Sequence, residues 1–396
     1  MNALSSIVQA LPSSGIRKIF DRALALEKEG HRVLRFDIGR PDIATPQFII
    51  DAAKVALDGG FTQYVANRGI PDLLDAIAGK LQRENGVRYD PETEIVVTTG
   101  ASEAVAAALF AVLEAGTEVM VPEPIWPHYR SCAQLAGATV VPVPLDIDNQ
   151  FALELDDLER HVSPRTRLLV LSNPVNPTGK VYGRQTLCQV LDFAQRHNLL
   201  VLADEIYEHF VFDEPFCSFA SLPGARERTI LVNGFSKVFG MTGWRLGYVA
   251  APAAVLTQIN KVHQYMTVCA TSFAQKGAVQ AYSHPAAGPF IQKVVNDYRK
   301  KNRVLVEEAS RVPGLTCCPP GGAFYFFPRL PDGLPNAEEM AMILLDQARV
   351  AVVPGNVFGQ GYERYLRISY GTCSVPELRE GMRRISTLFQ ARRKAA

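Results

Sequence analysis

The sequence predicts an α/β fold: a large domain on a mainly parallel, seven-stranded type of sheet flanked by helices, and a smaller α+β domain. Apolar, β-branched runs alternate with segments of helical spacing; the runs are EIVVTTG, TEVMVPEP, ATVVPVPL, RLLVLSNP, LLVLADEIY, TILVNGFSK and WRLGYVAAP. Runs that are apolar almost throughout are typical of strands buried on both faces. Because helical segments separate them, their connections are expected to be mostly parallel crossovers.

The N-terminal part of the chain predicts a helix that precedes this sheet. The segment IRKIFDRALALEKEG has apolar residues at helical spacing and stops at Gly30, because glycine readily adopts the left-handed backbone that ends a helix. We expect residues 1–45 to form an N-terminal arm and part of the small domain.

The C-terminal part predicts the remainder of the small domain. The segment FIQKVVNDYRKKNRVLVEEAS indicates a long charged helix, and GAFYFFP and YLRISYG indicate short strands. We expect residues 46–285 to form the large domain, and residues 286–396 to pack against the first 45 residues.

Composition excludes several classes of partner and site. The 396 residues carry a formal net charge of only +1, which argues against nucleic acid or an anionic membrane surface as a partner. The seven cysteines are scattered and form no C-x-x-C pair, so neither a disulfide framework nor a zinc site is expected. The start MNALSSIVQALPSSG lacks the pattern of a secretory leader. A cytoplasmic protein acting on small molecules is the expectation.

One strand-to-helix turn has the features of a phosphate site. Gly100, Ala101 and Ser102 follow the run EIVVTTG and precede a helical segment. Such a turn presents backbone N–H groups and the positive end of a helix dipole, both of which favour a phosphate. Many turns of this composition bind nothing, so the turn alone leaves both interpretations open.

Three other strands also end in polar residues. The segments NPVNPTGK, ADEIY and GFSK contribute Asn176, Asp204 with Tyr207, and Lys237. Each has a structural alternative: a rigid proline turn for the asparagine, a helix cap for the aspartate and an exposed loop for the lysine. Ligands of open α/β sheets bind at the carboxyl ends of the strands, so the four strand ends together predict one pocket.

Lys237 determines the chemistry expected in that pocket. An ammonium directly after a buried strand is costly, whereas a neutral amine can form an imine with an aldehyde cofactor. Pyridoxal 5′-phosphate supplies both the aldehyde and a phosphate. Asp204 is the candidate partner of its pyridine nitrogen, and Tyr207 and Asn176 are candidate partners of its phenolic oxygen.

The other cofactor contacts follow from charge and shape. Arg245 and Ser236, with the turn at Gly100, are candidates to bind the phosphate, because a guanidinium pairs with it through two hydrogen bonds. Trp126 is a candidate to stack on the ring, although a tryptophan of the core would give the same sequence.

The stretch GFSKVFGMTGWRLG, with NPVNPTGK, DEIY, DIGRPDIATP and YLRISYG in this order, resembles the class I and II aminotransferases, which are pyridoxal-phosphate enzymes of fold type I. The resemblance runs from about Ile16 to the C-terminal helix. It implies Lys237 as the attachment lysine and Asp204 as the partner of the ring nitrogen, with the remaining cofactor contacts at Tyr207, Asn176, Ala101, Ser102, Ser236, Arg245 and Trp126.

The resemblance also implies the substrate contacts and a homodimer. Arg367 corresponds to the arginine that pairs with the substrate α-carboxylate, and Gly39 to the backbone that closes over it. Tyr64 corresponds to the tyrosine that reaches the phosphate of the neighbouring subunit. The end of the pocket that holds the substrate's side chain is expected to be lined by apolar, aromatic or small residues. These are Gly15, Ile16, Tyr64, Trp126 and Tyr265. Arg40 differs from the family pattern, because relatives commonly carry an acidic or neutral residue at this position.

The function expected is transfer of an amino group between an α-amino acid and a 2-oxo acid in two half-reactions, with neutral or aromatic donors preferred. A β-lyase or a cyclopropane-forming synthase on the same fold is the alternative among enzymes, since fold does not determine function. A sensor that binds the cofactor without turnover is the alternative from another class. A nicotinamide dehydrogenase is disfavoured because no G-x-G-x-x-G opens a helix. The physiological substrate pair stays open.

Overall fold

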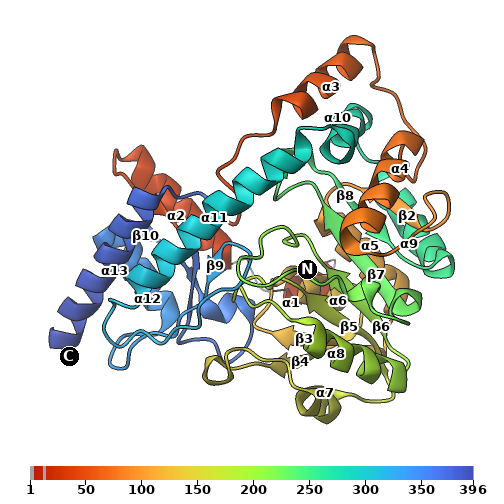
Figure 1. Ribbon diagram of the computed structural model, residues 1–396. Coiled ribbons are helices and arrows are strands. Elements are labelled where there is room, and N and C mark those ends of the chain that lie inside the picture. The colour runs from red at the N-terminus through yellow and green to blue at the C-terminus, as the bar shows by residue number, and fades with distance from the viewer. Residues whose placement is uncertain (1–3, 12–14, 396) are drawn as a thin grey trace.

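A seven-stranded sheet forms the centre of the larger group of elements in the computed structural model, which describes residues 4–11 and 15–395 (Figure 1). The sheet order is β2-β8-β7-β6-β5-β3-β4. Its strands are β2 (Ile95–Thr98), β3 (Glu118–Glu123), β4 (Thr139–Pro144), β5 (Thr166–Ser172), β6 (Leu200–Asp204), β7 (Thr229–Gly234) and β8 (Gly247–Ala250). Each of the seven predicted strands is present, and the α/β fold is confirmed.

The sheet is mainly parallel, as predicted, with one exception. Strands β3, β4, β5, β6 and β7 pair in parallel, whereas β8 runs antiparallel to both β2 and β7. Strand β4 lies at one edge and is partly exposed, whereas β2, β3, β7 and β8 are buried along their whole length. Pro142 and Pro144 lie in this edge strand, where the lack of an N–H costs least.

Helices cover both faces of the sheet because successive strand residues point to opposite faces. In β2, Val96 packs with α5 (Ala101–Val112), α6 (His128–Leu135) and α9 (Ala253–Thr267), whereas Ile95 and Val97 pack on the opposite side. That opposite side is covered by α7 (Leu155–His161), α8 (Arg184–Arg196), α4 (Pro71–Lys80) and α10 (Ser272–Ser283).

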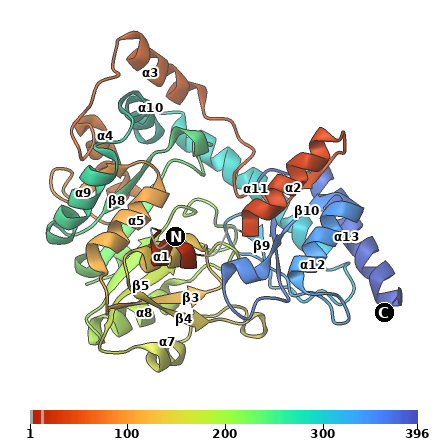
Figure 2. The ribbon, with the colours of Figure 1, turned by 180° about the vertical axis from the view of Figure 1, so that it is seen from behind.

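The smaller group of elements contains segments from both ends of the chain (Figures 1 and 2). Its helices are α2 (Gly15–Lys28), α12 (Ala337–Ile343) and α13 (Val375–Ala395), and α11 (Ala287–Ala309) runs from it toward α10. Its strands are β1 (Leu34–Arg35), β9 (Tyr325–Phe326), β10 (Val350–Ala351), β11 (Val353–Pro354) and β12 (Leu366–Ser369). Strand β1 pairs in parallel with β10, and β11, β12 and β9 form an antiparallel sheet.

The predicted N-terminal helix is α2, and Gly30, just beyond it, has φ +88°. The remaining α-helices of the described chain are α1 (Ser6–Ala10) and α3 (Gln47–Asp58), which packs on α10 at the top of Figure 1. The expected arm of residues 1–45 includes positions 1–3 and 12–14, which lie outside the described residues. Across residues 4–11 and 15–395, no helix is both long enough and apolar enough to cross a membrane.

Candidate active site

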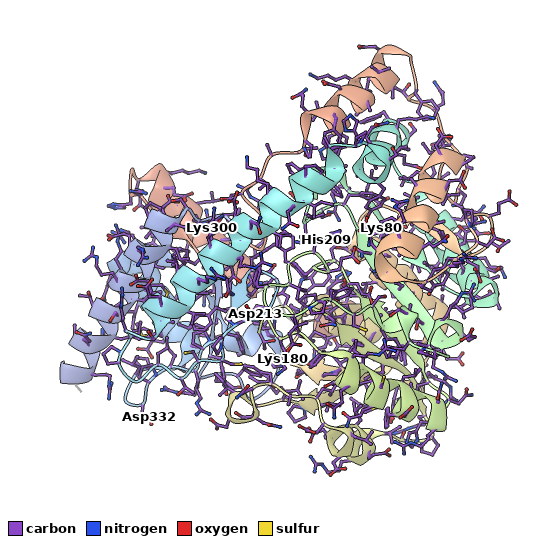
Figure 3. The ribbon with its side chains drawn as sticks, viewed as in Figure 1. Lys80, Lys180, His209, Asp213, Lys300 and Asp332 are labelled. Carbon is purple, nitrogen blue, oxygen red and sulfur yellow. The ribbon has the colours of Figure 1, made fainter. Side chains whose placement is uncertain are left out.

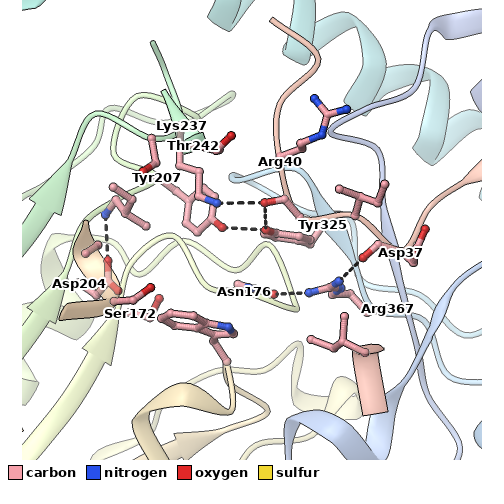
Figure 4. A pocket seen from close by; sticks show the side chains of 18 of the residues that line it. Asp37, Arg40, Ser172, Asn176, Asp204, Tyr207, Lys237, Thr242, Tyr325 and Arg367 are labelled. Carbon is pink, nitrogen blue, oxygen red and sulfur yellow. Dashed lines mark hydrogen bonds between the residues drawn. The ribbon is translucent and has the colours of Figure 1, made fainter. Parts of the chain in front are cut away.

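The carboxyl ends of the parallel strands open into a cavity of about 580 Å³ that both groups of elements line (Figure 4). Strands β5, β6 and β7 end in Ser172, Asp204 and Gly234, and the turns that follow carry the polar side chains. The cavity brings together the predicted residues Ile16, Gly39, Ala101, Ser102, Trp126, Asn176, Asp204, Tyr207, Ser236, Lys237, Arg245 and Arg367.

Lys237 lies in the turn after β7 with its amine inside the cavity. Its Nζ donates a hydrogen bond to the carbonyl oxygen of Gly39 at 3.0 Å (Figure 4). Burial lowers the pKa of Lys237 to about 8, and the positive charges of Arg367 and Arg245 act in the same direction against the attraction of Asp204. A substantial fraction of the amine is therefore neutral near pH 8, as covalent chemistry at this atom requires.

Asp204 ends β6 and is almost completely buried. Its Oδ2 accepts a 2.6 Å hydrogen bond from the hydroxyl of Tyr129, and its Oδ1 accepts one from the backbone N–H of Ile206 at 3.1 Å. Burial raises the pKa of Asp204, whereas the Tyr129 hydrogen bond opposes that shift. No helix begins at Asp204 in the described chain, because residues 206–209 form a turn, so the helix-cap alternative is excluded.

Tyr207 belongs to a hydroxyl cluster that the sequence did not indicate. Its hydroxyl lies 2.7 Å from that of Tyr325 on β9, and the Tyr325 hydroxyl also donates to the Gly39 carbonyl at 3.4 Å (Figure 4). A Cβ at Gly39 would lie 2.7 Å from the Tyr325 oxygen, so this close approach requires glycine. Burial raises the pKa of Tyr207 and of Tyr325, which keeps both hydroxyls protonated.

Arg367 on β12 is buried and only partly satisfied. Its Nη2 donates to the Asp37 carbonyl at 2.6 Å, its Nη1 lies 3.4 Å from Oδ1 of Asn176, and its Nε has no hydrogen-bond partner among the described residues. The guanidinium lies between the rings of Tyr325 and Phe358, each 5.0 Å away. A buried unpaired N–H is costly, so this side chain is suited to a carboxylate that enters the cavity.

The turn before α5 forms the other end of the cavity. Gly100 has φ +84°, and a Cβ at this position would lie 2.6 Å from Nη2 of Arg245, so only glycine allows the guanidinium to lie against the turn. Arg245 stays exposed and donates to the carbonyls of Thr242 and Thr99 at 3.1 and 3.5 Å. With Ala101, Ser102 and Ser236 beside it, the guanidinium and the helix N-terminus fit a phosphate.

Two residues that the sequence did not single out complete the cavity's polar framework. Tyr129 lies one helical turn after Trp126 and makes an edge-on ring contact with it, with ring centroids 5.6 Å apart. Tyr325 was recognised only as part of a short strand. Neither tyrosine carries a local signal, because its partner, Asp204 or Tyr207, is distant in the sequence.

A buried ion cluster supports the turn that carries Asp204 and Tyr207, and it too was absent from the sequence analysis. Lys80 of α4 is fully buried, donates to Oδ1 of Asn85 at 2.7 Å and pairs with Glu208. Glu208 also accepts a 2.7 Å hydrogen bond from Asn85. Figure 3 shows Lys80 and His209 in this part of the molecule.

Three predicted residues lie outside the cavity of the described chain. Tyr64 and Tyr265 are exposed, at 83% and 91%. Gly15 begins α2 and faces Val357, since a Cβ there would lie 2.5 Å from that side chain. The cavity is also lined by Arg17, Phe20, Ile38, Arg40 and Tyr129.

Comparison with known proteins shows the family of this chain. The family profile "Aminotransferase class I and II" matches residues 31–385. An aspartate aminotransferase of Pyrococcus abyssi is 40% identical over 99% of both chains, and an aromatic-amino-acid aminotransferase of Thermococcus litoralis is 38% identical over 99% of both. A solved aspartate aminotransferase of Thermus thermophilus with maleate is 34% identical, has a TM-score of 0.93, and is matched over 98% of this chain and 100% of its own.

These relatives favour transamination over β-elimination or cofactor sensing, and they confirm the resemblance inferred from the motifs. The donors present in the cavity fit the family's cofactor: an amine for its aldehyde, a carboxylate for its ring nitrogen and a guanidinium for its phosphate. The chain therefore belongs to the class I and II aminotransferases, enzymes that work with pyridoxal 5′-phosphate.

Proposed function

We propose that this enzyme transfers the amino group of neutral and aromatic α-amino acids to a 2-oxo acid, with Lys237 as the catalytic base and Arg367 as the anchor of the substrate. The observation that carries this proposal is the pairing of two groups in one cavity: a largely buried amine with a pKa lowered to about 8, and a buried guanidinium whose Nε is unpartnered.

The cofactor contacts follow from the donors around the cavity. We assign the phosphate to Arg245, Ser236 and the turn of Ala101 and Ser102. We assign the ring nitrogen to Asp204, the phenolic oxygen to Tyr207 and Asn176, and one ring face to Trp126. When bound, pyridoxal phosphate supplies the aldehyde that Lys237 holds and a ring that accepts the electrons released at the substrate Cα.

The residues of the chain perform the proton transfers and the positioning. Arg367 pairs with the α-carboxylate through Nε and one Nη, and Gly39 closes over it with its backbone. With the cofactor and substrate bound, the free Nζ of Lys237 would remove the Cα proton as general base and return a proton as general acid. Asp204 keeps a proton on the ring nitrogen because its carboxylate is buried and fixed by Tyr129.

The test of this assignment is Arg367→Lys. We expect kcat/KM to fall roughly 100-fold for every amino donor alike, since an ammonium cannot reproduce the two-pronged pairing of a guanidinium. Steady-state kinetics with four or more donors measures the effect. A loss confined to one donor would place Arg367 at the side-chain end of the pocket instead.

The donor preference rests on the side-chain end of the cavity. Ile16, Phe20 and Ile38 line it, and the two cations near it are exposed: Arg17, whose Nε lies 3.6 Å from Asp21, and Arg40. A second carboxylate would be desolvated there without a buried partner, which costs more than ordinary contacts return.

We therefore expect higher kcat/KM for phenylalanine and leucine than for aspartate. Measuring phenylalanine, leucine, aspartate and glutamate side by side, in the natural protein and in Arg40→Ala, tests the preference. A clear preference for aspartate that disappears in Arg40→Ala would show that Arg40 turns inward to bind an acidic side chain.

We further propose a homodimer in which Tyr64 reaches the phosphate of the neighbouring subunit. Exposed apolar residues near Tyr64 support a protein partner for this surface: Tyr265, Met266 and Val268 are 91%, 44% and 49% exposed. We expect sedimentation to give twice the chain mass, and Tyr64→Phe to weaken cofactor binding about 10-fold, as for loss of one hydrogen bond to a charged group. A monomer that is fully active would contradict the arrangement.

A further inference from the structure

His263 of α9 lies outside the cavity, yet it contacts the residue that fixes the turn before α5. It is completely buried. Its Nδ1 lies 2.6 Å from Oε1 of Glu103, and its Nε2 lies 2.9 Å from the backbone carbonyl oxygen of Asn67. Helices α5 and α9 lie side by side in both views of the ribbon (Figures 1 and 2).

Glu103 is bound as a carboxylate rather than as a neutral acid. Its Oε2 accepts a hydrogen bond from the backbone N–H of Thr99, and its Oε1 lies 3.1 Å from the hydroxyl of Thr267 as well as near His263. Burial opposes ionisation of Glu103, but the hydrogen bonds and the charge of His263 hold its pKa below the usual value. Hydrogen bonds from the Thr99 N–H and the Thr267 hydroxyl, together with the contact to His263, stabilise the carboxylate form of Glu103.

Each ring nitrogen of His263 faces an acceptor, and the Thr267 hydroxyl lies 3.2 Å from Nδ1 as a further neighbour. A carbonyl oxygen can only accept, and the Glu103 oxygen is part of a carboxylate. A neutral imidazole donates from one nitrogen only. Its other nitrogen would then point a buried lone pair at the oxygen of Glu103 or of Asn67. With Glu103 as a carboxylate, the imidazolium donates in both contacts and also balances the buried charge of Glu103.

The contacts extend from the turn to the surface loop. Glu103 binds the N–H of Thr99, directly before the turn of Gly100, while Asn67 lies three residues after Tyr64. The side-chain amide of Asn67 donates to the Val268 carbonyl at 2.6 Å. Val268 has φ +66°, a conformation that is rare for a β-branched residue and that its surroundings must maintain.

We propose that His263 is a positioning residue of the phosphate site: held as an imidazolium between Glu103 and Asn67, it cancels the carboxylate charge beside the turn and ties that turn to residues 61–69. This inference rests on the proposed assignment of the phosphate to that turn. Without the imidazolium, the Glu103 carboxylate in the first turn of α5 would repel a phosphate bound at the same helix end.

The protonation state is tested directly in the full-length holoenzyme. We expect ¹⁵N NMR of histidine-labelled protein at neutral pH to show both ring nitrogens of His263 protonated, with the signal assigned by its loss in His263→Asn. A neutral tautomer for this residue would overturn the proposal whatever the activity of the variants.

The role in phosphate binding is tested with two variants that each retain one contact. The amide of His263→Asn lies where Nδ1 was and can still donate to Glu103, whereas the amide of His263→Gln lies where Nε2 was and can donate only to Asn67. Calorimetric titration of cofactor-free full-length protein with inorganic phosphate should give roughly 10-fold weaker binding for His263→Gln and a smaller loss for His263→Asn, within the usual range of coupling between sites.

A double variant separates charge from packing. In E103Q/H263Q no buried charge is left unpaired, so we expect it to fold even if His263→Gln does not, and to bind phosphate within about 3-fold of the natural protein. Phosphate affinity in a folded His263→Gln equal to that of the natural protein would overturn the proposal, as would a double variant that binds more weakly than His263→Gln.

Two controls distinguish this inference from the assignment of the phosphate site. His197 forms a similar pair with Glu159 at 3.0 Å, between α7 and α8 and outside the cavity, so His197→Gln should leave phosphate affinity unchanged. Arg245→Gln should abolish phosphate binding if the site itself is assigned correctly. Loss in Arg245→Gln without loss in His263→Gln would refute only the role of His263.

Discussion

Lys237→Ala is expected to reduce the rate of transamination about 100- to 10,000-fold, the range that general-base catalysis contributes. The variant loses both the covalent attachment of the cofactor and the base that removes the Cα proton. Absorbance spectra should show that the protein no longer carries the visible band of lysine-bound cofactor. Turnover like that of the natural protein would refute the assignment of Lys237.

The pH dependence of attachment provides an independent measure of the same amine. Because burial and neighbouring positive charges lower the pKa of Lys237 to about 8, the neutral form is minor below that pH and dominant above it. The rate at which cofactor-free protein takes up pyridoxal phosphate should therefore rise with pH through about 8 and then level off. A rate that keeps rising toward pH 10 would indicate an ordinary, exposed lysine.

Asp204→Ala is expected to leave the cofactor bound through its phosphate and through Lys237 while lowering kcat roughly 100- to 1,000-fold, the cost of losing one preorganised electrostatic contact. The reason is electronic: the carboxylate keeps the ring nitrogen protonated, and without that proton the ring is a poor acceptor of the electrons from Cα. Rapid-mixing measurement of the first half-reaction, with cofactor content determined in parallel, checks the prediction.

Tyr129→Phe is the matched control for Asp204→Ala, because it removes the 2.6 Å hydrogen bond to the carboxylate but keeps the carboxylate itself. Its effect on kcat should be well below that of Asp204→Ala, since the charge facing the ring nitrogen remains. If Asp204→Ala folds, binds cofactor and transaminates normally, Asp204 has only a structural role at the end of β6.

The sheet was predictable from the sequence because each strand is encoded by its own residues. The seven apolar runs are the seven strands, and burial on both faces explains why β2, β3, β7 and β8 show no polar alternation. The direction of β8 was not predictable in the same way. Residues 247–250 are as apolar as the other runs. Only the pairing of β8 with β2 and β7 shows that this strand is antiparallel.

The same difference between local and distant contacts separates the site residues that could be predicted from those that could not. Asn176, Asp204 and Lys237 could be predicted to meet, because each follows a strand of one sheet and those strand ends share an edge. Tyr129 and Tyr325 could not, because the hydroxyl of each meets a partner 75 or 118 residues away. Neither tyrosine differs locally from an aromatic residue of the core.

The sequence by itself determined the fold class, the strand ends that carry the polar site residues, and the cofactor. Strand runs, helix stops and strand-end residues are local properties of the chain. Only the tertiary structure decided the unpartnered Nε of Arg367 and the surroundings from which we propose a charged His263. Both depend on which atoms surround a buried group: Nε of Arg367 has no hydrogen-bond partner among the described residues, whereas the ring nitrogens of His263 face the Glu103 carboxyl group and the Asn67 carbonyl. Such environments arise when distant segments pack together, so no pattern along the chain records them.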